Sequence, residues 1–353
     1  TRKNEKYNIR RIIMRRAGYV DILKALCAFL VVCIHAPFPG IVGDYFTALS
    51  RVAVPIFFMI TGYYYAYTVK QNKSINQIIK IFKLLIMGNA LYFIWKIVIM
   101  LITGNNILLF LQKTFTVNNL LKFLVFNESP LGGHLWYIGA ILYVLIIILV
   151  AEWLNFTKIL YYFIPIFLLG NLIFGKYSIL VFGKEFPVYL TRNYLFVGLP
   201  YFLIGALIKQ KIIDRKVFNW RGLNPYMVIL FILTTLIERW LLVNFSVNAT
   251  RDDYLSTTFL AIALFGLFFS YHYDDCKSNE KKVRIMLAEI GRYYSSWIYI
   301  LHPIFITVIV DIVSKLNMYS KYIYVAPVVV YIVTTLFVMG FKYISGKRLI
   351  FSH

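Results

Sequence analysis

Residues 18–39 read GYVDILKALCAFLVVCIHAPFP, a stretch in which Asp21, Lys24 and His35 stand among runs of Leu, Ala and Val. A helix over residues 18–37 would rise 1.5 Å per residue and span about 30 Å, the thickness of the hydrocarbon core of a bilayer. The whole chain of 353 residues is 60% hydrophobic and 15% charged, whereas soluble domains average about 45–50% and about 25%. A soluble enzyme, a disulfide scaffold and a disordered chain are therefore excluded.

Nine further apolar stretches repeat this pattern, so the sequence predicts an all-α, polytopic membrane bundle of about ten transmembrane helices. The predicted spans are 18–37, 47–69, 77–103, 131–151, 157–174, 191–209, 224–242, 254–272, 288–312 and 321–344. Residues 107–125 are apolar but are interrupted by Lys113, Asn118, Asn119 and Lys122. That pattern favours a helix lying at the membrane interface over an eleventh span.

The distribution of Lys and Arg predicts the orientation. With both termini inside, 26 of the 37 Lys and Arg residues fall in cytoplasmic segments, as the positive-inside rule requires. Residues 1–17 are then a basic cytoplasmic arm and residues 346–353 a cytoplasmic tail. The net charge of +22 lies in short clusters between apolar stretches, so it indicates orientation in a lipid bilayer and excludes a nucleic-acid partner.

The few cysteines and the absent motifs limit the chemistry further. Cys27 and Cys33 lie on different faces of one predicted helix and Cys276 in a charged loop, so we expect free thiols. The chain contains no P-loop, nucleophile elbow, HExxH motif or cysteine-rich cluster, so we expect no metal site and no soluble-type nucleotide chemistry.

Ionisable residues inside membrane spans are costly and usually face the bundle interior or a hydrated cavity. Lys24 and His35 are eleven residues apart, which places them on one helix face about 16 Å apart along the axis. One face of the first span thus carries a polar group near each membrane surface. Either these groups line a path across the bilayer, or Lys24 extends to lipid phosphates and His35 only bonds within the bundle.

Further polar groups are predicted near the outer surface. His134 opens the fourth span, Glu238 closes the seventh, and His302 lies within the ninth, before a proline that can break the helix ladder. We expect these three side chains and His35 to line one outward-facing polar cavity. Two arginines at the outer starts of other spans would make its mouth attractive to a carboxylate: Arg51 and Arg192.

Three lysines of the third span have open roles. Lys80 and Lys83 share one helix face at i and i+3, where they could receive a phosphate-bearing ligand or lipid headgroups. Lys96 lies deep in the same span and either extends outward or pairs with a carboxylate such as Glu238 or Asp311.

Four segments resemble the acyltransferase-3 family of integral membrane proteins over about residues 18–345: YVDILKALCAFLVVCIH (19–35), SRVAVPIFFMITGYY (50–64), HLWYIGAILYV (134–144) and SSWIYILHPIF (295–305). Within that family the chain looks most like the membrane domain of the vancomycin-resistance, membrane-bound serine racemases. The pointers are RVAVPIFFMITGYY (51–64), GGHLWYIGA (132–140), and LIERW (236–240) followed by RDDY (251–254).

The resemblance implies roles for several residues. The family signature on the first span is an Arg, ten residues and a His; His35 matches as the candidate catalytic residue, and Lys24 replaces the Arg. The family's Arg-x-x-Arg on the third span, thought to bind the phosphates of the acyl donor, acyl-CoA, is matched by Lys80 and Lys83. Lysine keeps the charge but not the bidentate fork of arginine.

The racemase resemblance also implies a missing part. In those proteins a racemase domain, which uses pyridoxal phosphate as its cofactor, follows the membrane domain, and homodimers are possible. The sequence stops at GKRLIFSH (346–353), where that domain would begin, so we expect it to be a fragment without the racemase domain, and we expect no cofactor in this chain beyond acyl-CoA.

Three hypotheses follow. First, the chain imports L-serine for conversion to D-serine, with the carboxylate held by Arg51 or Arg192 and the ammonium by Glu238. Second, it transfers an acyl group from acyl-CoA to a hydroxyl outside the cell, with His35 as general base or acyl carrier. Third, it is an anchor and dimerisation platform for the racemase. Each hypothesis places the chain in the bacterial cytoplasmic membrane.

Overall fold

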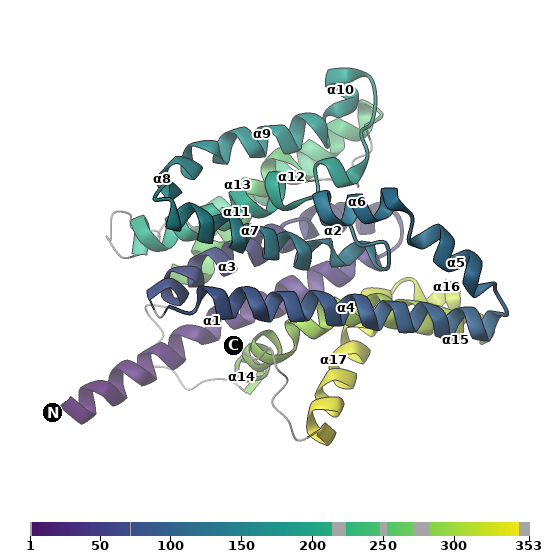
Figure 1. The fold of residues 1–353 in the computed structure, drawn as a ribbon, viewed down its shortest axis with the longest axis horizontal. Coiled ribbons are helices and arrows are strands. Elements are labelled where there is room, and N and C mark those ends of the chain that lie inside the picture. The colour runs from purple at the N-terminus through teal and green to yellow at the C-terminus, as the bar shows by residue number, and fades with distance from the viewer. Residues whose placement is uncertain (1, 71, 214–223, 248–252, 271–281, 346–353) are drawn as a thin grey trace. The chain divides into compact units, whose positions relative to one another are not determined.

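The computed structural model describes residues 2–70, 72–213, 224–247, 253–270 and 282–345 (Figure 1). These residues form helices and loops, with no β-strand among them. The all-helical prediction is therefore confirmed for the described part of the chain. Cys276 and the predicted tail 346–353 lie outside the described residues.

The chain divides into two compact units. Unit 1 comprises Thr1–Phe57, Phe218–Trp240 and Leu255–His353, and unit 2 comprises Phe58–Val217 and Leu241–Tyr254. Helices α3 (Ala53–Lys70) and α12 (Asn224–Asn244) pass from one unit to the other. The other helices of unit 1 are α1 (Arg2–His35), α2 (Gly40–Ser50), α13 (Leu255–Ser270), α14 (Lys282–Glu289), the π-turn η7 (Ile290–Tyr294), α15 (Ser295–Lys315), α16 (Tyr319–Tyr322) and α17 (Ala326–Ser345).

Unit 2 contains the remaining elements. They are α4 (Ser74–Thr103), α5 (Ile107–Thr114), α6 (Val117–Phe126), η1 (Gly133–Leu135), α7 (Trp136–Trp153), α8 (Thr157–Leu160), η2 (Tyr161–Phe163), α9 (Ile164–Phe174), α10 (Ser178–Phe182), η3 (Val188–Leu190), η4 (Tyr194–Gly198), α11 (Leu199–Leu207) and η5 (Ile208–Ile213).

Eight helical segments among the described residues have the length and apolar composition needed to cross a membrane. They are Gly18–His35, Gly40–Tyr65, Ser74–Thr103, Gly133–Trp153, Thr157–Phe174, Pro225–Asn244, Lys282–Lys315 and Ala326–Ile344. The predicted spans 191–209 and 254–272 correspond to shorter apolar helices, Tyr194–Gln210 and Leu255–Phe268. The multi-pass helical class is thus established, and the count of ten stays a prediction.

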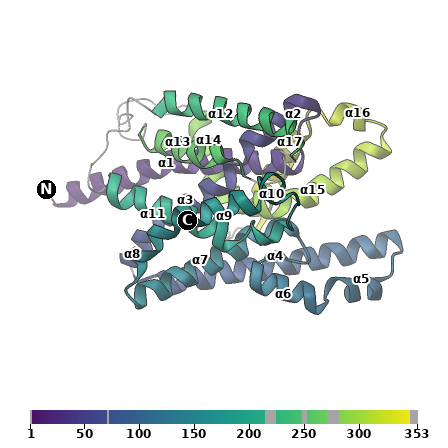
Figure 2. The same ribbon diagram turned by 90° about the horizontal axis from the view of Figure 1, so that it is seen from above.

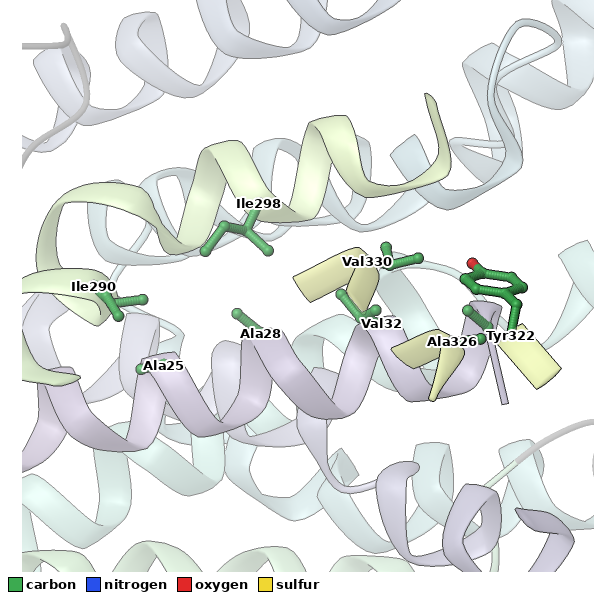
Figure 3. Close-up of a cluster of buried hydrophobic side chains, with 9 residues drawn as sticks. Ala25, Ala28, Val32, Ile290, Ile298, Tyr322, Ala326 and Val330 are labelled. Carbon is green, nitrogen blue, oxygen red and sulfur yellow. The ribbon is translucent and has the colours of Figure 1, made fainter. Parts of the chain in front are cut away.

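The core of unit 1 is built on α1, α15 and α17. Small side chains of α1, Ala25 and Ala28, lie against Ile290 and Ile298 of the η7–α15 segment (Figure 3). Ala326 and Val330 of α17 join the same buried cluster. The small residues let the helix backbones approach closely, as is typical of packing within membranes.

In each unit, glycine residues lie where two helix backbones approach each other closely. A Cβ atom on Gly291 of η7 would lie 1.6 Å from the backbone oxygen of Asp21 in α1. In unit 2, a Cβ on Gly62 of α3 would lie 1.9 Å from the carbonyl oxygen of Phe202, and one on Gly205 of α11 would lie 2.0 Å from that of Met59. At these crossings two backbones touch, so no other residue fits without displacing a helix.

Residues 107–125 form two short helices in place of the single interfacial helix that we predicted (Figure 2). The polar residues of this segment make the break. Thr116 caps α6 by accepting a hydrogen bond from the Asn119 backbone N–H at 3.2 Å, and the Asn119 amide donates to the carbonyls of Lys113 and Thr114. The break follows because these side chains bond the backbone locally and satisfy both helix ends.

Candidate functional site

Two of the predicted imidazoles meet in unit 1. The ring centroids of His35, in the last turn of α1, and His302 of α15 are 5.0 Å apart. His35 is exposed, whereas His302 is fully buried. The pair therefore presents one ring that a substrate can reach, backed by one held inside the bundle.

The backbone of α15 fixes the tautomer of His302. Its Nδ1 lies 3.0 Å from the carbonyl oxygen of Ile298, one turn earlier. A carbonyl oxygen only accepts, so Nδ1 carries the proton and donates it, and the lone pair of the neutral ring lies on Nε2. Pro303 follows directly and has no N–H, so it withholds one hydrogen bond from the ladder at this level.

The other polar end of α1 holds an ion network. Asp21 is only 3% exposed, and its two oxygens contact two cations: Oδ1 lies 3.1 Å from Lys24 Nζ, and Oδ2 accepts a hydrogen bond from Arg292 Nε at 2.7 Å. Arg292 lies in the π-turn η7, an irregularity often found at functional positions. Lys24 is thus held by a carboxylate within the bundle, contrary to the alternative in which it only extends to lipid phosphates.

Both contacts join the same two segments. Asp21 and His35 belong to α1, and Arg292 and His302 to the η7–α15 segment, so these two segments run parallel. The ten residues from Arg292 to His302 correspond to about 15 Å of helix. The prediction of a polar group at each end of one face of α1 is matched by a partner for each end on a second helix.

Glu238 makes contacts that the sequence did not indicate. Its carboxylate accepts hydrogen bonds from the backbone N–H groups of Leu255 at 2.7 Å and Ser256 at 2.9 Å. It therefore caps α13, where a carboxylate also complements the helix dipole. The neighbouring Arg239 is 6% exposed, pairs with Asp44 of α2 at 2.9 Å and lies 5.1 Å over the ring of Tyr45.

The remaining predicted residues of the outer cavity are divided between the units. His134 belongs to unit 2, where it is buried against Tyr92 with ring centroids 4.7 Å apart. Arg192, also in unit 2, lies 5.7 Å over the ring of Trp136. Arg51 follows α2 in unit 1 and is half-buried. The structure thus brings His35 and His302 together, and a cavity shared by all these residues stays a prediction.

The lysines of α4 lie in unit 2. Lys80 is half-buried and Lys83 exposed, one turn apart. Lys96 lies 5.8 Å over the ring of Phe110 in α5. Of the two carboxylates predicted as partners for Lys96, Glu238 caps α13 and Asp311 pairs with Lys315 at 2.7 Å. The pairing of Lys96 with a carboxylate stays a prediction.

The cysteines and possible metal ligands can be assessed among the described residues. Cys27 and Cys33 are buried and free of disulfides, as predicted. Among the described residues, no group of three or more His, Cys, Asp or Glu side chains is placed to hold a metal ion.

Long apolar helices with buried ion pairs and a histidine pair define a multi-pass membrane protein with a polar site inside its bundle. The chain belongs to the Acyl_transf_3 family, whose model, described as an acyltransferase domain, matches residues 18–345. Comparison with curated proteins and with solved structures gave no match.

Proposed function

We propose that the chain is a membrane acyltransferase that moves an acyl group from a phosphate-bearing thioester, of the acyl-CoA type, to a hydroxyl acceptor. The observation that carries this proposal is the contact between His35 and His302 in a chain of the acyltransferase family. His35 is the exposed member and faces the acceptor; His302, fixed by its bond to Ile298, orients it.

The reaction needs one base and one proton path. The imidazole of His35 takes the proton of the acceptor hydroxyl as its oxygen attacks the thioester carbonyl. A C–O bond forms, the C–S bond breaks, and the departing thiolate takes the proton back from the imidazolium.

The proposed function also includes an orientation of the chain in the membrane. Ten spans with both termini in the cytoplasm of a bacterium would place the Asp21 network inside and the His35–His302 pair outside. The charge bias of the loops supports this arrangement. The acyl donor would then bind from the cytoplasm and the acceptor from outside.

The test measures release of CoA thiol from acetyl-CoA by purified protein in liposomes supplied with hydroxyl acceptors such as sugars and glycerol. We expect His35→Gln to lower the rate at least a hundredfold, because general base catalysis contributes about 10²–10⁴-fold. His302→Gln should lower kcat more than it raises KM, and Lys315→Gln, in an exposed ion pair, should behave as wild type. Equal rates for His35→Gln and wild type would exclude His35 as the base.

Import of L-serine is the second candidate. One observation favours it: the Nε–H of Arg192 is buried and, among the described residues, has no hydrogen-bond partner, so it is available to a carboxylate. The serine would then pass to a pyridoxal-phosphate-dependent racemase domain.

Labelled L-serine uptake into proteoliposomes tests this candidate. Uptake above that of empty vesicles, lost in Arg192→Gln and kept in Lys315→Gln, would support import. If folded protein shows neither uptake nor CoA release, and His35→Gln leaves cellular D-serine output unchanged, the chain acts as an anchor and dimerisation platform.

A further inference from the structure

Arg239 is a buried cation whose hydrogen-bond donors are only partly used. The residue is 6% exposed, and its Nη2 lies 2.9 Å from Asp44 Oδ2. Its Nε and Nη1 are buried as well, and neither has a hydrogen-bond partner among the described residues. Buried donors without acceptors cost free energy, and in native proteins they are usually met by an ordered water or a ligand. Arg239 can therefore donate to a molecule that the protein binds.

A second arginine of unit 1 shows what distinguishes this arrangement. Arg292 also donates to a carboxylate, but its side chain is 30% exposed, so its remaining N–H groups can reach water. The side chain of Arg239 is only 7% exposed. Its ion pair with Asp44 accounts for one of the three guanidinium nitrogens and leaves the donors of the other two for a further acceptor.

The neighbours of Arg239 connect it to the surface of unit 1. Asp44 and Tyr45 belong to α2, which lies beside α12 (Figure 2). The side chain of Asp44 is 54% exposed, and the half-buried ring of Tyr45 lies 5.1 Å from the centre of the guanidinium. We name Arg239, Asp44 and Tyr45 the arginine site.

The arginine site lies at the end of unit 1 that carries the histidine pair. Gly43, next to Asp44, is packed against the backbone of Phe38, and the rings of Phe38 and Phe46 have centroids 5.5 Å apart. Phe38 follows His35 by three residues, which is at most about 11 Å of chain. The histidine pair and the arginine site are therefore within reach of one elongated molecule.

We infer that the arginine site binds a neutral hydroxyl group of the acyl acceptor, other than the hydroxyl that reacts at His35; the inference rests on the proposed acyltransferase function. A hydroxyl both accepts and donates hydrogen bonds. It can accept from Nε or Nη1 of Arg239 and donate to the carboxylate of Asp44. The site therefore selects acceptors that carry at least two hydroxyl groups.

The charges at the arginine site favour a neutral group over an anion. The carboxylate of Asp44 balances the guanidinium of Arg239. The residue before Arg239 is a second carboxylate, Glu238, which caps α13. A carboxylate or phosphate that entered here would face like charges, whereas a hydroxyl keeps the Arg239–Asp44 pair in place and bonds to both members.

Sorbitol and 1-hexanol test the inference, because their carbon chains are equally long but only sorbitol has more than one hydroxyl group. CoA release from acetyl-CoA is measured with each acceptor and the full chain in liposomes, and binding of labelled sorbitol is measured without acetyl-CoA. We expect Arg239→Gln to raise the KM and the Kd for sorbitol about tenfold. Arg239→Lys, which keeps the charge but not the planar fork, should raise them less.

The same variants separate recognition from structure. The KM for acetyl-CoA should stay as in wild type, and kcat/KM for 1-hexanol should change far less than that for sorbitol, a split that a merely structural role would not produce. Asp44→Asn alters an exposed side chain without changing its shape, so it tests the site even if the Arg239 variants fail to fold, and it should also weaken sorbitol binding. Asp311→Asn, the same substitution in an exposed ion pair of unit 1, is the matched control and should bind sorbitol as wild type.

Three results would overturn the inference: equal sorbitol binding in wild type, Arg239→Gln and Asp44→Asn, no sorbitol binding in any of them, or an equal loss of kcat/KM for 1-hexanol. Failure of the proposed function is separable. Arg239-dependent sorbitol binding without CoA release for any acceptor would keep the site and remove the acyltransferase proposal, and sorbitol-dependent CoA release that is unchanged in Arg239→Gln would do the reverse.

Discussion

In unit 1, Lys24, Arg292 and Arg239 each contact a carboxylate, whereas in unit 2 Lys122, Lys176 and Arg192 lie over aromatic rings. A buried ion pair costs desolvation of two charges and becomes strongly destabilising when one partner is removed. A ring holds a cation without burying an anion. Removing the partner of one of these three unit 1 cations should therefore cost more stability than removing a ring beneath one of the three unit 2 cations.

Unit 2 contains a buried hydrogen-bond network, centred on Asn127, that involves no charged group. Asn127 donates from Nδ2 to the carbonyl of Trp136 at 2.9 Å and accepts at Oδ1 from the backbone N–H of Tyr194 at 3.1 Å. Its φ of 55° lies in the left-handed region, which asparagine tolerates. One amide thus links the start of α7 to η4 without any charge.

The largest effect is expected at the glycine crossings. Gly291→Ala and Gly205→Ala each place a Cβ within 2.0 Å of a backbone oxygen, so each should destabilise its unit by more than about 3 kcal/mol. In SDS unfolding, Gly340→Ala, with nothing within 4 Å of its Cβ position, is the matched control. In protein that still folds, Gly291→Ala should lower the rate of CoA release and Gly205→Ala should leave it unchanged, because only Gly291 lies next to the segment that carries His302. The reverse pattern would contradict the proposal that the reaction takes place at the histidine pair of unit 1.

The next effect compares the two networks directly. Asp21→Asn leaves Lys24 and Arg292 without their negative partner and should lower the free energy of unfolding by about 3 kcal/mol. Asn127→Ala loses two neutral hydrogen bonds and should lower it by about 2 kcal/mol. Denaturation at low and high salt separates them, since only the Asp21→Asn loss should depend on ionic strength. An equal salt dependence would contradict the contrast between the units.

A smaller effect separates buried from exposed ion pairs within unit 1. Asp44→Asn removes the carboxylate from the buried Arg239 and should cost about 1–3 kcal/mol. Asp311→Asn breaks the exposed ion pair between Asp311 and Lys315, which lie one helix turn apart. It should lower the free energy of unfolding by less than about 1 kcal/mol. Thermal unfolding of both variants measures the difference, and equal costs would mean that the burial of Arg239 has no energetic weight.

The smallest effect concerns a cation on a ring in unit 2. Tyr189→Leu keeps an apolar side chain but removes the ring 4.9 Å below Lys122 Nζ, and should cost about 0.5–1 kcal/mol. Thermal unfolding with Tyr324→Leu, an exposed tyrosine of unit 1, as control detects it. A loss as large as that of Asp21→Asn would remove the distinction between rings and carboxylates.

The all-helical class and part of the candidate site could be predicted from the sequence. Lys24 and His35 are separated by whole helix turns, so their shared face followed from periodicity alone, and His302 was marked by its place beside Pro303. Arg292 could not be paired with Asp21 from one sequence, because the two are 271 residues apart. The capping role of Glu238 was hidden too, since its partners are backbone N–H groups that begin another helix.

The parallel course of α1 and the η7–α15 segment has a mechanical consequence. Because one pair of helices carries both the Asp21–Arg292 bond and the His35–His302 contact, a slide by one turn, about 5.4 Å, would shift the register at both ends together. Any change that locks the register at the Asp21 end therefore sets the spacing of the two imidazoles at the opposite end, without itself extending that far.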